Sequence, residues 1–181
     1  MRGAEAIVEK SSLLGYPTVV KKRIAKRYRE RKLDEKLRKD RTRGEARLLH
    51  KAKIAGVKCP TVLEVEDFSI TLDFISGERP EMNKTEAQQA GELLAKLHNA
   101  DLIHGDYTPA NLLIKGKEMF VIDFGLGFVS KDIEDKAVDV FTMIRSISEK
   151  DAFLKGYSKY EKSESIMKRV KQVEKRVRYA F

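Results

Sequence analysis

The sequence predicts an α+β fold in two lobes, with a small β-rich N-terminal lobe and a reduced, mainly helical C-terminal lobe. β-branched and other apolar residues in residues 1–24 and 62–75 favour strands. Beyond residue 83, apolar residues recur at helical spacing. The segment Ser76-Gly77-Glu78-Arg79-Pro80 separates the two patterns with turn-forming residues. We therefore expect one lobe over residues 1–75 and the other over residues 76–181.

Three polar residues stand out on two short apolar segments that a turn connects. The first segment reads Ile103-His104-Gly105-Asp106-Tyr107-Thr108-Pro109-Ala110-Asn111, and the second reads Val121-Ile122-Asp123-Phe124-Gly125. Each half alone is compatible with an ordinary turn. Together, His-x-Asp-x4-Asn, a hairpin-length gap and Asp-Phe-Gly form the catalytic loop and the metal loop of the protein-kinase-like fold. We therefore expect a minimal bilobal protein-kinase-like fold.

These residue types suit phosphoryl transfer. Asp106 would accept or orient the proton of an attacking hydroxyl or water. Asn111 would offer an amide oxygen, and Asp123 a carboxylate, to Mg²⁺, a hard cation that prefers oxygen ligands. The sequence thus predicts Asp106 as a catalytic residue and Asn111 and Asp123 as ligands of the metal and the nucleotide. His104 is expected to pack behind the loop, and Gly125 to allow the bend that aims Asp123 towards it.

Length and composition limit the kind of protein. At 181 residues the chain can bury one core or two small lobes. It has no apolar run of about twenty residues and no secretory pattern, so we expect a cytoplasmic protein. Its one cysteine, Cys59, is expected to pack in the interior. The formal charge of +9 favours a polyanionic partner such as RNA or an acidic protein, or else a solvated surface.

The first two strands are expected on either side of a Gly15-Tyr16-Pro17 turn. The chain contains no G-x-G-x-x-G there, so a short turn centred on Gly3-Ala4-Glu5 is the expected cover for the phosphates. Lys21 follows Thr18-Val19-Val20, where the strand lysine of a kinase would stand, and would reach the α- and β-phosphates. Lys22 alternates to the other face of the strand and is the second choice for this role.

In the heavily charged stretch from Tyr28 to Arg43, Leu33 and Leu37 lie at helical spacing. From Thr42 the chain is expected to continue as a helix that directs Leu48, Leu49 and Ala52 towards a core. In a kinase-like fold this helix presents an acid to the strand lysine, and Glu45 is the candidate for this catalytic role. The alternative is that Glu45 pairs with neighbouring arginines on its own helix.

Two further strands are expected at residues 62–66 and 69–75, on either side of a short turn. Adenine would bind against the backbone of Asp73 to Ile75, with Leu72 behind it. Because recognition by the backbone leaves little trace in side chains, this assignment rests on position alone.

The C-terminal lobe is expected to contain three helices. The first follows a capping box at Asn83-Lys84-Thr85-Glu86, the second spans residues 133–147 and the third spans residues 163–177. No Ala-Pro-Glu follows the short segment after Asp-Phe-Gly, so a conventional peptide-docking platform is not expected. Asp139 is expected either to hydrogen-bond the backbone of the catalytic loop from the helix below or to be exposed. The basic face of the last helix and its tail either is solvated or binds RNA or a partner.

At this point the chain resembles a known family, the small atypical kinases of the KEOPS complex, also called PRPK-like or piD261-like, and in particular their archaeal members. The resemblance covers essentially the whole chain and rests on the following motifs: Gly3-Ala4-Glu5-Ala6, Val20-Lys21, Tyr28-Arg29, Arg41-Thr42-Arg43-Gly44-Glu45-Ala46-Arg47, the catalytic and metal loops, Glu134-Asp135-Lys136-Ala137-Val138-Asp139, and the basic C-terminus.

The resemblance implies ATP and Mg²⁺ as cofactors and phosphorylation of the protein itself or of protein serines, with ATP hydrolysis in support of tRNA modification. It implies as partners the subunit that transfers a threonylcarbamoyl group to adenosine of tRNA, a further small KEOPS subunit, and tRNA through the basic tail. By matching positions, Lys21 and Glu45 would be the phosphate-binding pair, Asp106 the acid or base, and Asn111 and Asp123 the metal ligands.

Three alternatives remain open from the sequence. An aminoglycoside-type small-molecule kinase also uses His-Gly-Asp-x4-Asn, but only about fifty residues follow Phe128 for a substrate lobe. A RIO-type kinase is nearer, but the block Arg41-Thr42-Arg43 fits it poorly. A nucleotide-binding scaffold with weak catalysis is the third alternative. Because Thr108 stands where kinases commonly place a lysine on the transferred phosphate, we expect ATP hydrolysis to equal or exceed peptide phosphorylation.

Overall fold

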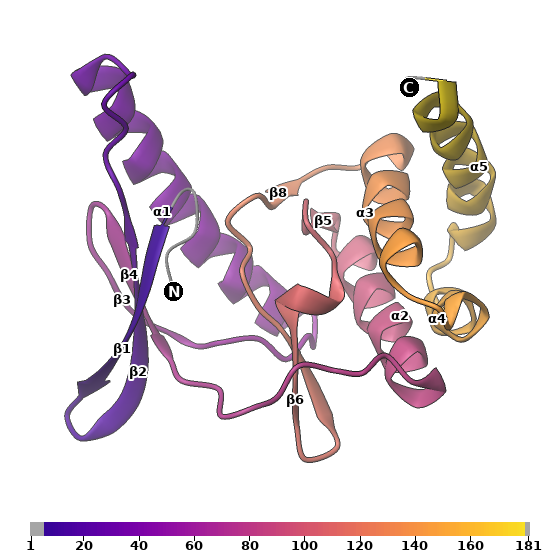
Figure 1. Ribbon diagram of the computed structural model, residues 1–181, viewed down its shortest axis with the longest axis horizontal. Helices are drawn as coiled ribbons and strands as arrows, with labels where there is room; N and C mark the ends of the chain where they lie inside the picture. Colours follow the sequence, from indigo (N-terminus) through magenta and orange to yellow (C-terminus); the bar gives the residue numbers. More distant parts are fainter. Residues whose placement is uncertain (1–5, 180–181) are drawn as a thin grey trace.

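The computed structural model describes residues 6–179, and its side chains as far as residue 175. A sheet with one long helix forms one side of the molecule, and four helices with two short hairpin-like pairs of strands form the other (Figure 1). This arrangement confirms the predicted α+β fold with a β-rich N-terminal lobe and a helical C-terminal lobe. Among the described helices, none is both long enough and apolar enough to cross a membrane.

The N-terminal sheet is antiparallel, with strand order β1-β2-β4-β3. Its strands are β1 (Ala6–Leu13), β2 (Tyr16–Arg23), β3 (Val62–Val65) and β4 (Ser69–Asp73). The turn between β1 and β2 is made by Leu14 and Gly15, whose φ angles are 51° and 82°. Two residues with positive φ match the right-handed twist of the strands. The turn therefore lies one residue earlier than predicted, and Tyr16 already pairs with Leu13.

Helix α1 (Arg31–Ile54) is one continuous helix of 24 residues. It begins at Arg31, inside the charged stretch in which Leu33 and Leu37 lie at helical spacing, and Glu30 caps it by accepting hydrogen bonds from the amides of Lys32 at 3.0 Å and Leu33 at 2.9 Å. Its C-terminal half packs towards the interior through Leu48, Leu49 and Ala52. Its N-terminal half rises beyond the sheet at the upper left of Figure 1.

The C-terminal lobe contains the helices α2 (Lys84–Asn99), α3 (Ile133–Ser146), α4 (Lys150–Tyr157) and α5 (Ser163–Tyr179). The capping box is confirmed, because Asn83 accepts from the amide of Glu86 at 3.0 Å and Glu86 accepts from the amide of Asn83 at 3.2 Å. The helix α4 was not predicted. It has only eight residues, too few to show a helical period in the sequence.

Short strands carry the loops of the C-terminal lobe. They are β5 (Leu102–Ile103), which pairs with β8 (Phe128–Val129), and β6 (Leu112–Lys115), which pairs with β7 (Glu118–Val121). A 3-10 turn over Pro109–Asn111 precedes β6. The pairs β5–β8 and β6–β7 hold the two polar loops next to each other.

The core includes the thiol of Cys59, which is 2% exposed. The thiol donates to the carbonyl of Leu49 at 3.4 Å, and burial raises the pKa of Cys59 to about 11. The expectation that Cys59 packs in the interior is confirmed.

Two glycines let α2 and α4 pack backbone against backbone. A Cβ atom on Gly91 would lie 2.0 Å from the carbonyl oxygen of Phe153, and a Cβ on Gly156 would lie 2.0 Å from the carbonyl oxygen of Gln88. No side chain fits at either position without separating the helices, so the contact requires glycine on both.

We expect Gly91→Ala to lower the free energy of unfolding by about 2–3 kcal/mol, because the new methyl group overlaps a backbone carbonyl that cannot move alone. Urea unfolding followed by circular dichroism measures the change. Gly44→Ala in α1 is the matched control, since no atom lies within 4 Å of its added Cβ. Alanine there should leave stability unchanged or raise it by about 0.5–1 kcal/mol. Equal effects of the two substitutions would contradict the close packing of α2 and α4.

Candidate active site

The catalytic loop between β5 and β6 is held from below by a buried carboxylate. Asp139 on α3 is 1% exposed and accepts from the amide of His104 at 2.7 Å and from that of Gly105 at 2.9 Å. The first of the two readings of Asp139 from the sequence is therefore confirmed. Its oxygen Oδ2 also lies 3.4 Å from Nε2 of His98 on α2, so α2 and α3 meet at the base of the loop.

His104 joins the catalytic loop to the metal loop. Its ring is fully buried, with Nε2 3.0 Å from the carbonyl oxygen of Ile122 and Nδ1 3.3 Å from the amide nitrogen of Asp106. The ring also packs against Phe124, with 4.9 Å between the ring centroids. His104 thus fixes the backbone on both sides of the site, as the sequence predicted.

Asp106 and Asn111 form one unit at the tip of the loop. The amide nitrogen Nδ2 of Asn111 donates to the carboxylate Oδ2 of Asp106 at 2.9 Å and to its carbonyl oxygen at 2.8 Å. Because both bonds use the amide nitrogen, the amide oxygen of Asn111 is the atom that remains for a cation.

The two loops touch at a glycine. Gly105 has a φ of 80°, and a Cβ atom there would lie 2.4 Å from the carbonyl oxygen of Leu126. Glycine is required both for the left-handed backbone and for the close approach. The segment after Asp-Phe-Gly therefore lies directly on the catalytic loop, where Phe128 pairs with Ile103.

Asp123 adopts a left-handed backbone with a φ of 61°, an uncommon conformation for a residue with a side chain. The predicted role of Gly125 in the bend is therefore wrong, because the positive φ belongs to Asp123 itself. Gly125 instead supplies room, since a Cβ there would lie 3.0 Å from Oδ1 of Asp123 and 3.2 Å from Nζ of Lys21. Asparagine and aspartate tolerate the left-handed region better than most residues.

The carboxyl group of Asp123 is ready to bind a cation. Burial raises its pKa, but the ammonium of Lys21 and the amide of Gly125 outweigh burial and hold the pKa below the ordinary value of an aspartate. The Gly125 amide donates to Oδ1 at 3.1 Å. Asp123 is therefore ionised at neutral pH.

Lys21 connects the two lobes. Its Nζ lies 2.8 Å from Oε1 of Glu45 on α1 and 2.6 Å from Oδ1 of Asp123. The structure thus brings the three predicted residues together and excludes the alternative that Glu45 pairs with arginines on its own helix. Lys22 points to the other face of β2, where its exposed Nζ lies 3.7 Å from a carboxylate oxygen of Glu9.

Arg23 is a residue of this cluster that the sequence reasoning missed. Its Nη2 lies 2.6 Å from Oε2 of Glu45, and the two side chains are 5% and 1% exposed. Strand residues two apart lie on the same face, so the alternation that chose Lys21 over Lys22 also places Arg23 beside Lys21. The buried carboxylate of Glu45 therefore carries one cation on each oxygen.

An apolar cavity of about 180 Å³ leads to this cluster. It is lined by the side chains and backbone of Val8, Val19, Pro60, Leu72, Asp73, Phe74, Ile75, Leu113 and Ile122, and Lys21, Glu45 and Asp123 lie at its polar end. The predicted adenine-binding residues Leu72, Asp73 and Ile75 thus face one cavity with the predicted phosphate-binding residues. The predicted turn at Gly3-Ala4-Glu5 lies outside the described residues.

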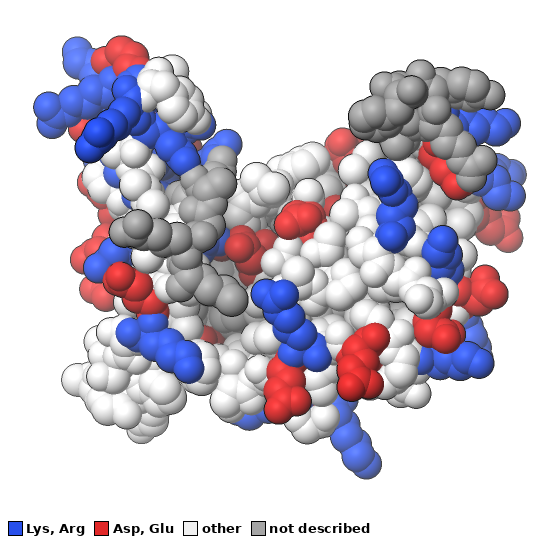
Figure 2. All heavy atoms as spheres, in the orientation of Figure 1, with Lys and Arg blue, Asp and Glu red and all other residues white. Residues whose placement is uncertain are grey.

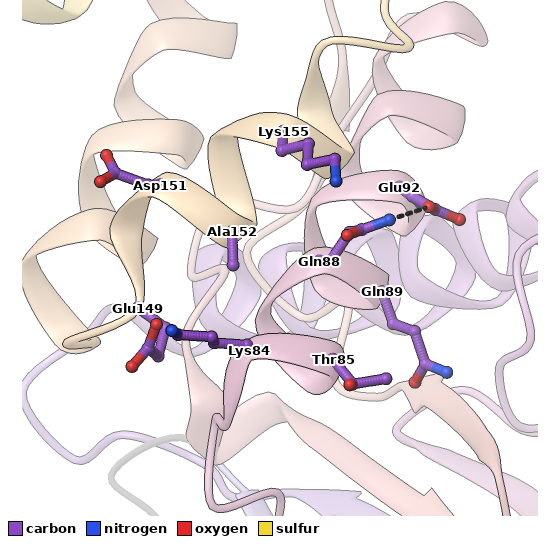
Figure 3. A pocket seen from close by; sticks show the side chains of 9 residues that line it. All are labelled: Lys84, Thr85, Gln88, Gln89, Glu92, Glu149, Asp151, Ala152 and Lys155. Carbon is purple, nitrogen blue, oxygen red and sulfur yellow. Dashed lines mark hydrogen bonds between the residues drawn. The ribbon is translucent and has the colours of Figure 1, made fainter.

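A larger cavity of about 900 Å³ lies away from these loops, between α2 and α4 (Figure 3). Its rim carries side chains of both charges, among them Lys84, Glu92, Glu149 and Lys155. The labelled side chains in Figure 3 spread along the groove and do not converge on a point, so the smaller cavity is the better candidate for an active site.

The site combines a lysine–glutamate pair in a β-rich lobe with a His-x-Asp loop and an Asp-Phe-Gly loop in a helical lobe. This combination defines the class of protein-kinase-like enzymes. The protein-family model described as "RIO domain" matches residues 8–163. The Rio2 kinase of Chaetomium thermophilum, solved in an ADP/Mg²⁺-phosphoaspartate complex, has the same fold with a TM-score of 0.68. That match covers 100% of this chain and 70% of that chain at 14% sequence identity.

Relatives in sequence narrow the class further. An Archaeoglobus fulgidus protein named "Probable serine/threonine-protein kinase BUD32 homolog" is 40% identical over an alignment of 171 positions, which covers 89% of this chain and 88% of that protein. A Methanosarcina mazei protein named "Probable bifunctional tRNA threonylcarbamoyladenosine biosynthesis protein" is 38% identical over an alignment of 190 positions, which covers 98% of this chain and 35% of that protein. The chain belongs to the BUD32 homologues, a family of kinases with a RIO domain.

The resemblance drawn from the sequence is thereby confirmed, and the RIO-type alternative describes the same broader family. The chain spans about a third of the length of the bifunctional relatives that it matches.

We expect Arg23→Met to lower the free energy of unfolding by about 3 kcal/mol, because removing one partner of a buried ion pair leaves Glu45 with a single cation. Thermal and urea unfolding of the purified chain measure the loss. Arg43→Met is the matched control, since the Arg43 side chain is 62% exposed and lies 3.6 Å from Asp67. That substitution should change stability by about 0.5 kcal/mol or less. A loss for Arg23→Met no larger than the control would show that the buried pair contributes nothing.

Proposed function

We propose that the chain transfers the γ-phosphoryl group of ATP, with Mg²⁺, to water or to a serine or threonine hydroxyl. The observation that carries the proposal is the position of Lys21, which contacts Glu45 and Asp123 at the polar end of the cavity. Lys21 and Glu45 would act as the phosphate-binding pair, with Lys21 on the α- and β-phosphates.

The catalytic step would depend on Asp106. Its carboxylate would accept or orient the proton of the attacking hydroxyl or water, while the bond from Asn111 fixes the orientation of the carboxylate. Asp139 and His104 would act behind Asp106 by fixing the backbone of the loop.

The residues present fit a magnesium site. The ionised carboxylate of Asp123 and the amide oxygen of Asn111 are oxygen ligands of the kind that Mg²⁺ prefers, and phosphates and water would supply the remaining ligands. Magnesium bound there would neutralise charge that develops on the phosphates during transfer. Asp123 would have to exchange its contact with Lys21 for the cation when the nucleotide binds.

Adenine would lie in the apolar cavity, with Leu72 behind it and the backbone of Asp73 to Ile75 along its edge. The amides of Asp73 and Phe74 already donate to carbonyl oxygens of Thr61 and Pro17. Within the part of the chain that the structure describes, the Ile75 amide has no such acceptor and is our candidate donor to the base. The lobes would meet at the predicted boundary between residues 75 and 76, beside this edge.

We propose further that this activity supports the formation of threonylcarbamoyladenosine in tRNA, as a subunit of the KEOPS complex. Two Methanosarcina relatives support this proposal. In each, the region that matches this chain is part of a longer protein named "Probable bifunctional tRNA threonylcarbamoyladenosine biosynthesis protein". The partners would be a threonylcarbamoyl transferase subunit and a further small KEOPS subunit. Contact with tRNA through the basic tail is proposed from charge, because the side chains beyond residue 175 lie outside the described residues.

Hydrolysis should compete well with phosphorylation of proteins. Thr108 occupies the position in the catalytic loop where a lysine commonly holds the transferred phosphate. Without that charge the γ-phosphate is less firmly placed on a hydroxyl acceptor, so water is a competitive acceptor.

We expect Asp106→Ala and Asp123→Ala each to lower phosphoryl transfer at least about 100-fold, because one removes the proton acceptor and the other a metal ligand. The assay follows γ-labelled phosphate from ATP with Mg²⁺, as free phosphate and as phosphoprotein, with and without tRNA and the transferase partner. Asp151→Ala, at an exposed site on α4, is the control and should retain wild-type rates.

Two outcomes would contradict parts of the proposal. Label that stays on ATP under every condition, while nucleotide still binds, would leave a nucleotide-binding scaffold in place of an enzyme. Efficient phosphorylation of an added peptide with negligible free phosphate would exclude hydrolysis as a main activity.

A further inference from the structure

Positive charge is concentrated in one short part of the chain. Residues 23–43 contain eleven Lys or Arg and four Asp or Glu, a net charge of +7 against +9 for the whole protein. This segment, which we call the basic arm, comprises the end of β2, the connection to α1 and the first half of α1. It forms the upper left end of the molecule in Figure 1, and Figure 2 shows Lys and Arg side chains crowded over that end.

Two arginines of the basic arm, Arg29 and Arg38, lie beside a buried acid. Asp34 is 3% exposed and accepts from Nε of Arg38 at 2.6 Å and from the amide of Lys26 at 3.2 Å. Its other neighbour is Arg29, at 3.8 Å. The guanidinium of Arg38 also lies over the ring of Phe68, 3.9 Å from its centroid. Because these side chains are already ordered, binding an anion would cost less conformational entropy than it would at a flexible lysine surface.

Arg29 and Arg38 also line a shallow indentation, together with Arg23, Ile24, Lys26 and Arg41. Five of the six are cationic, and three of these, Arg23, Arg29 and Arg38, lie beside the carboxylate of Glu45 or Asp34. Arginine presents planar, paired donors that match the oxygens of a phosphate. The indentation measures only about 10 Å³, so a phosphate would lie over it and contact the cations at its rim.

An aromatic ring lies at the surface in the middle of this charge. Tyr28 is 78% exposed and is followed by Arg29, whose guanidinium lies 5.4 Å from the centre of the ring. An exposed ring among arginines is the arrangement that binds unpaired bases by stacking while the cations follow the phosphate backbone. An acidic protein surface would use the charge but would leave this ring without a function.

We propose that the basic arm binds RNA, with phosphates on its arginines and lysines and an unpaired base on Tyr28. This inference deepens the RNA part of the proposed function and is independent of phosphoryl transfer. It places an RNA contact on the N-terminal lobe, on an element distinct from the basic C-terminal helix α5.

The test measures the binding of a fluorescent tRNA transcript to the full chain by anisotropy over a range of salt concentrations. The test variant Arg27→Ala/Lys32→Ala/Lys36→Ala removes three exposed charges of the arm. Its affinity should fall about tenfold or more at low salt, and the slope of log K against log[salt] should decrease by about 2 to 3. Tyr28→Ala should lower the affinity about tenfold while leaving the salt slope unchanged.

Two triple variants serve as controls with the same loss of charge. Lys84→Ala/Lys115→Ala/Lys117→Ala removes exposed charges from α2 and the β6–β7 hairpin, and it should bind as the wild type does. Lys168→Ala/Lys171→Ala/Lys175→Ala tests α5. The proposal is overturned if the arm variant binds RNA as tightly as the wild type, if it loses no more than the first control, or if the loss is confined to α5. The proposal is also overturned if the arm variant binds RNA normally but binds the transferase partner more weakly. That result would identify the arm as a protein-binding surface.

ATP turnover without RNA separates this proposal from the proposed function. The arm variant should hydrolyse ATP at the wild-type rate, since its three substituted residues lie outside the candidate active site. If wild-type protein binds RNA through the arm but turns over no ATP, the RNA surface stands while phosphoryl transfer fails. If ATP turns over but the arm does not affect RNA binding, only the present inference fails.

Discussion

The ion pairs of Lys21 are the interaction on which the site depends. Lys21 comes from the sheet, Glu45 from the long helix and Asp123 from the C-terminal lobe, so one ammonium group joins all three parts. A buried charge is costly unless it is paired, and Glu45 is paired on both oxygens. The pairing of Glu45 with Lys21 and Arg23 therefore fixes α1 against β2 with the glutamate inward. In the structure this happens without any contribution from a segment beyond the metal loop.

The C-terminal half of the site is fixed by backbone contacts. Asp139 and His104 hold the catalytic loop by its amides, and β8 pairs with β5 immediately after the metal loop. Gly105 allows the two loops to touch. In longer kinases an activation segment between the metal loop and Ala-Pro-Glu orders these parts. Here the chain passes from the metal loop through a two-residue strand into α3, and the catalytic loop is ordered by contacts within the described fold.

The sequence predicts which residues form the candidate site better than it predicts the residues and backbone conformations around it. Asp106, Asn111 and Asp123 follow a spacing that the chemistry requires, and Lys21 follows from strand alternation. Arg23 follows the same strand alternation, but no sequence motif marks it. Its role becomes visible only in the structure, where it pairs with the buried Glu45. The left-handed backbone of Asp123 leaves no trace in composition, because the neighbouring Gly125 is the residue that normally signals such a bend.

The same contrast applies to the elements. The capping box identified the start of α2, since two side chains close it locally. The existence of α4 depends on contacts distant in sequence, such as Gly156 against Gln88. The helical period of 3.6 residues in the sequence does not predict such contacts. These contacts also determine how closely the helices of the C-terminal lobe pack.

The continuity of α1 has a mechanical consequence. A helix rises about 1.5 Å per residue, so the 24 residues of α1 form a rod of about 36 Å. In the described helix, neither proline nor a break in hydrogen bonding divides the exposed charged end from the turn that contains Glu45. Because α1 is one rigid helix, a force that tilts its N-terminal end also moves Glu45 and changes the distance between Glu45 and Lys21.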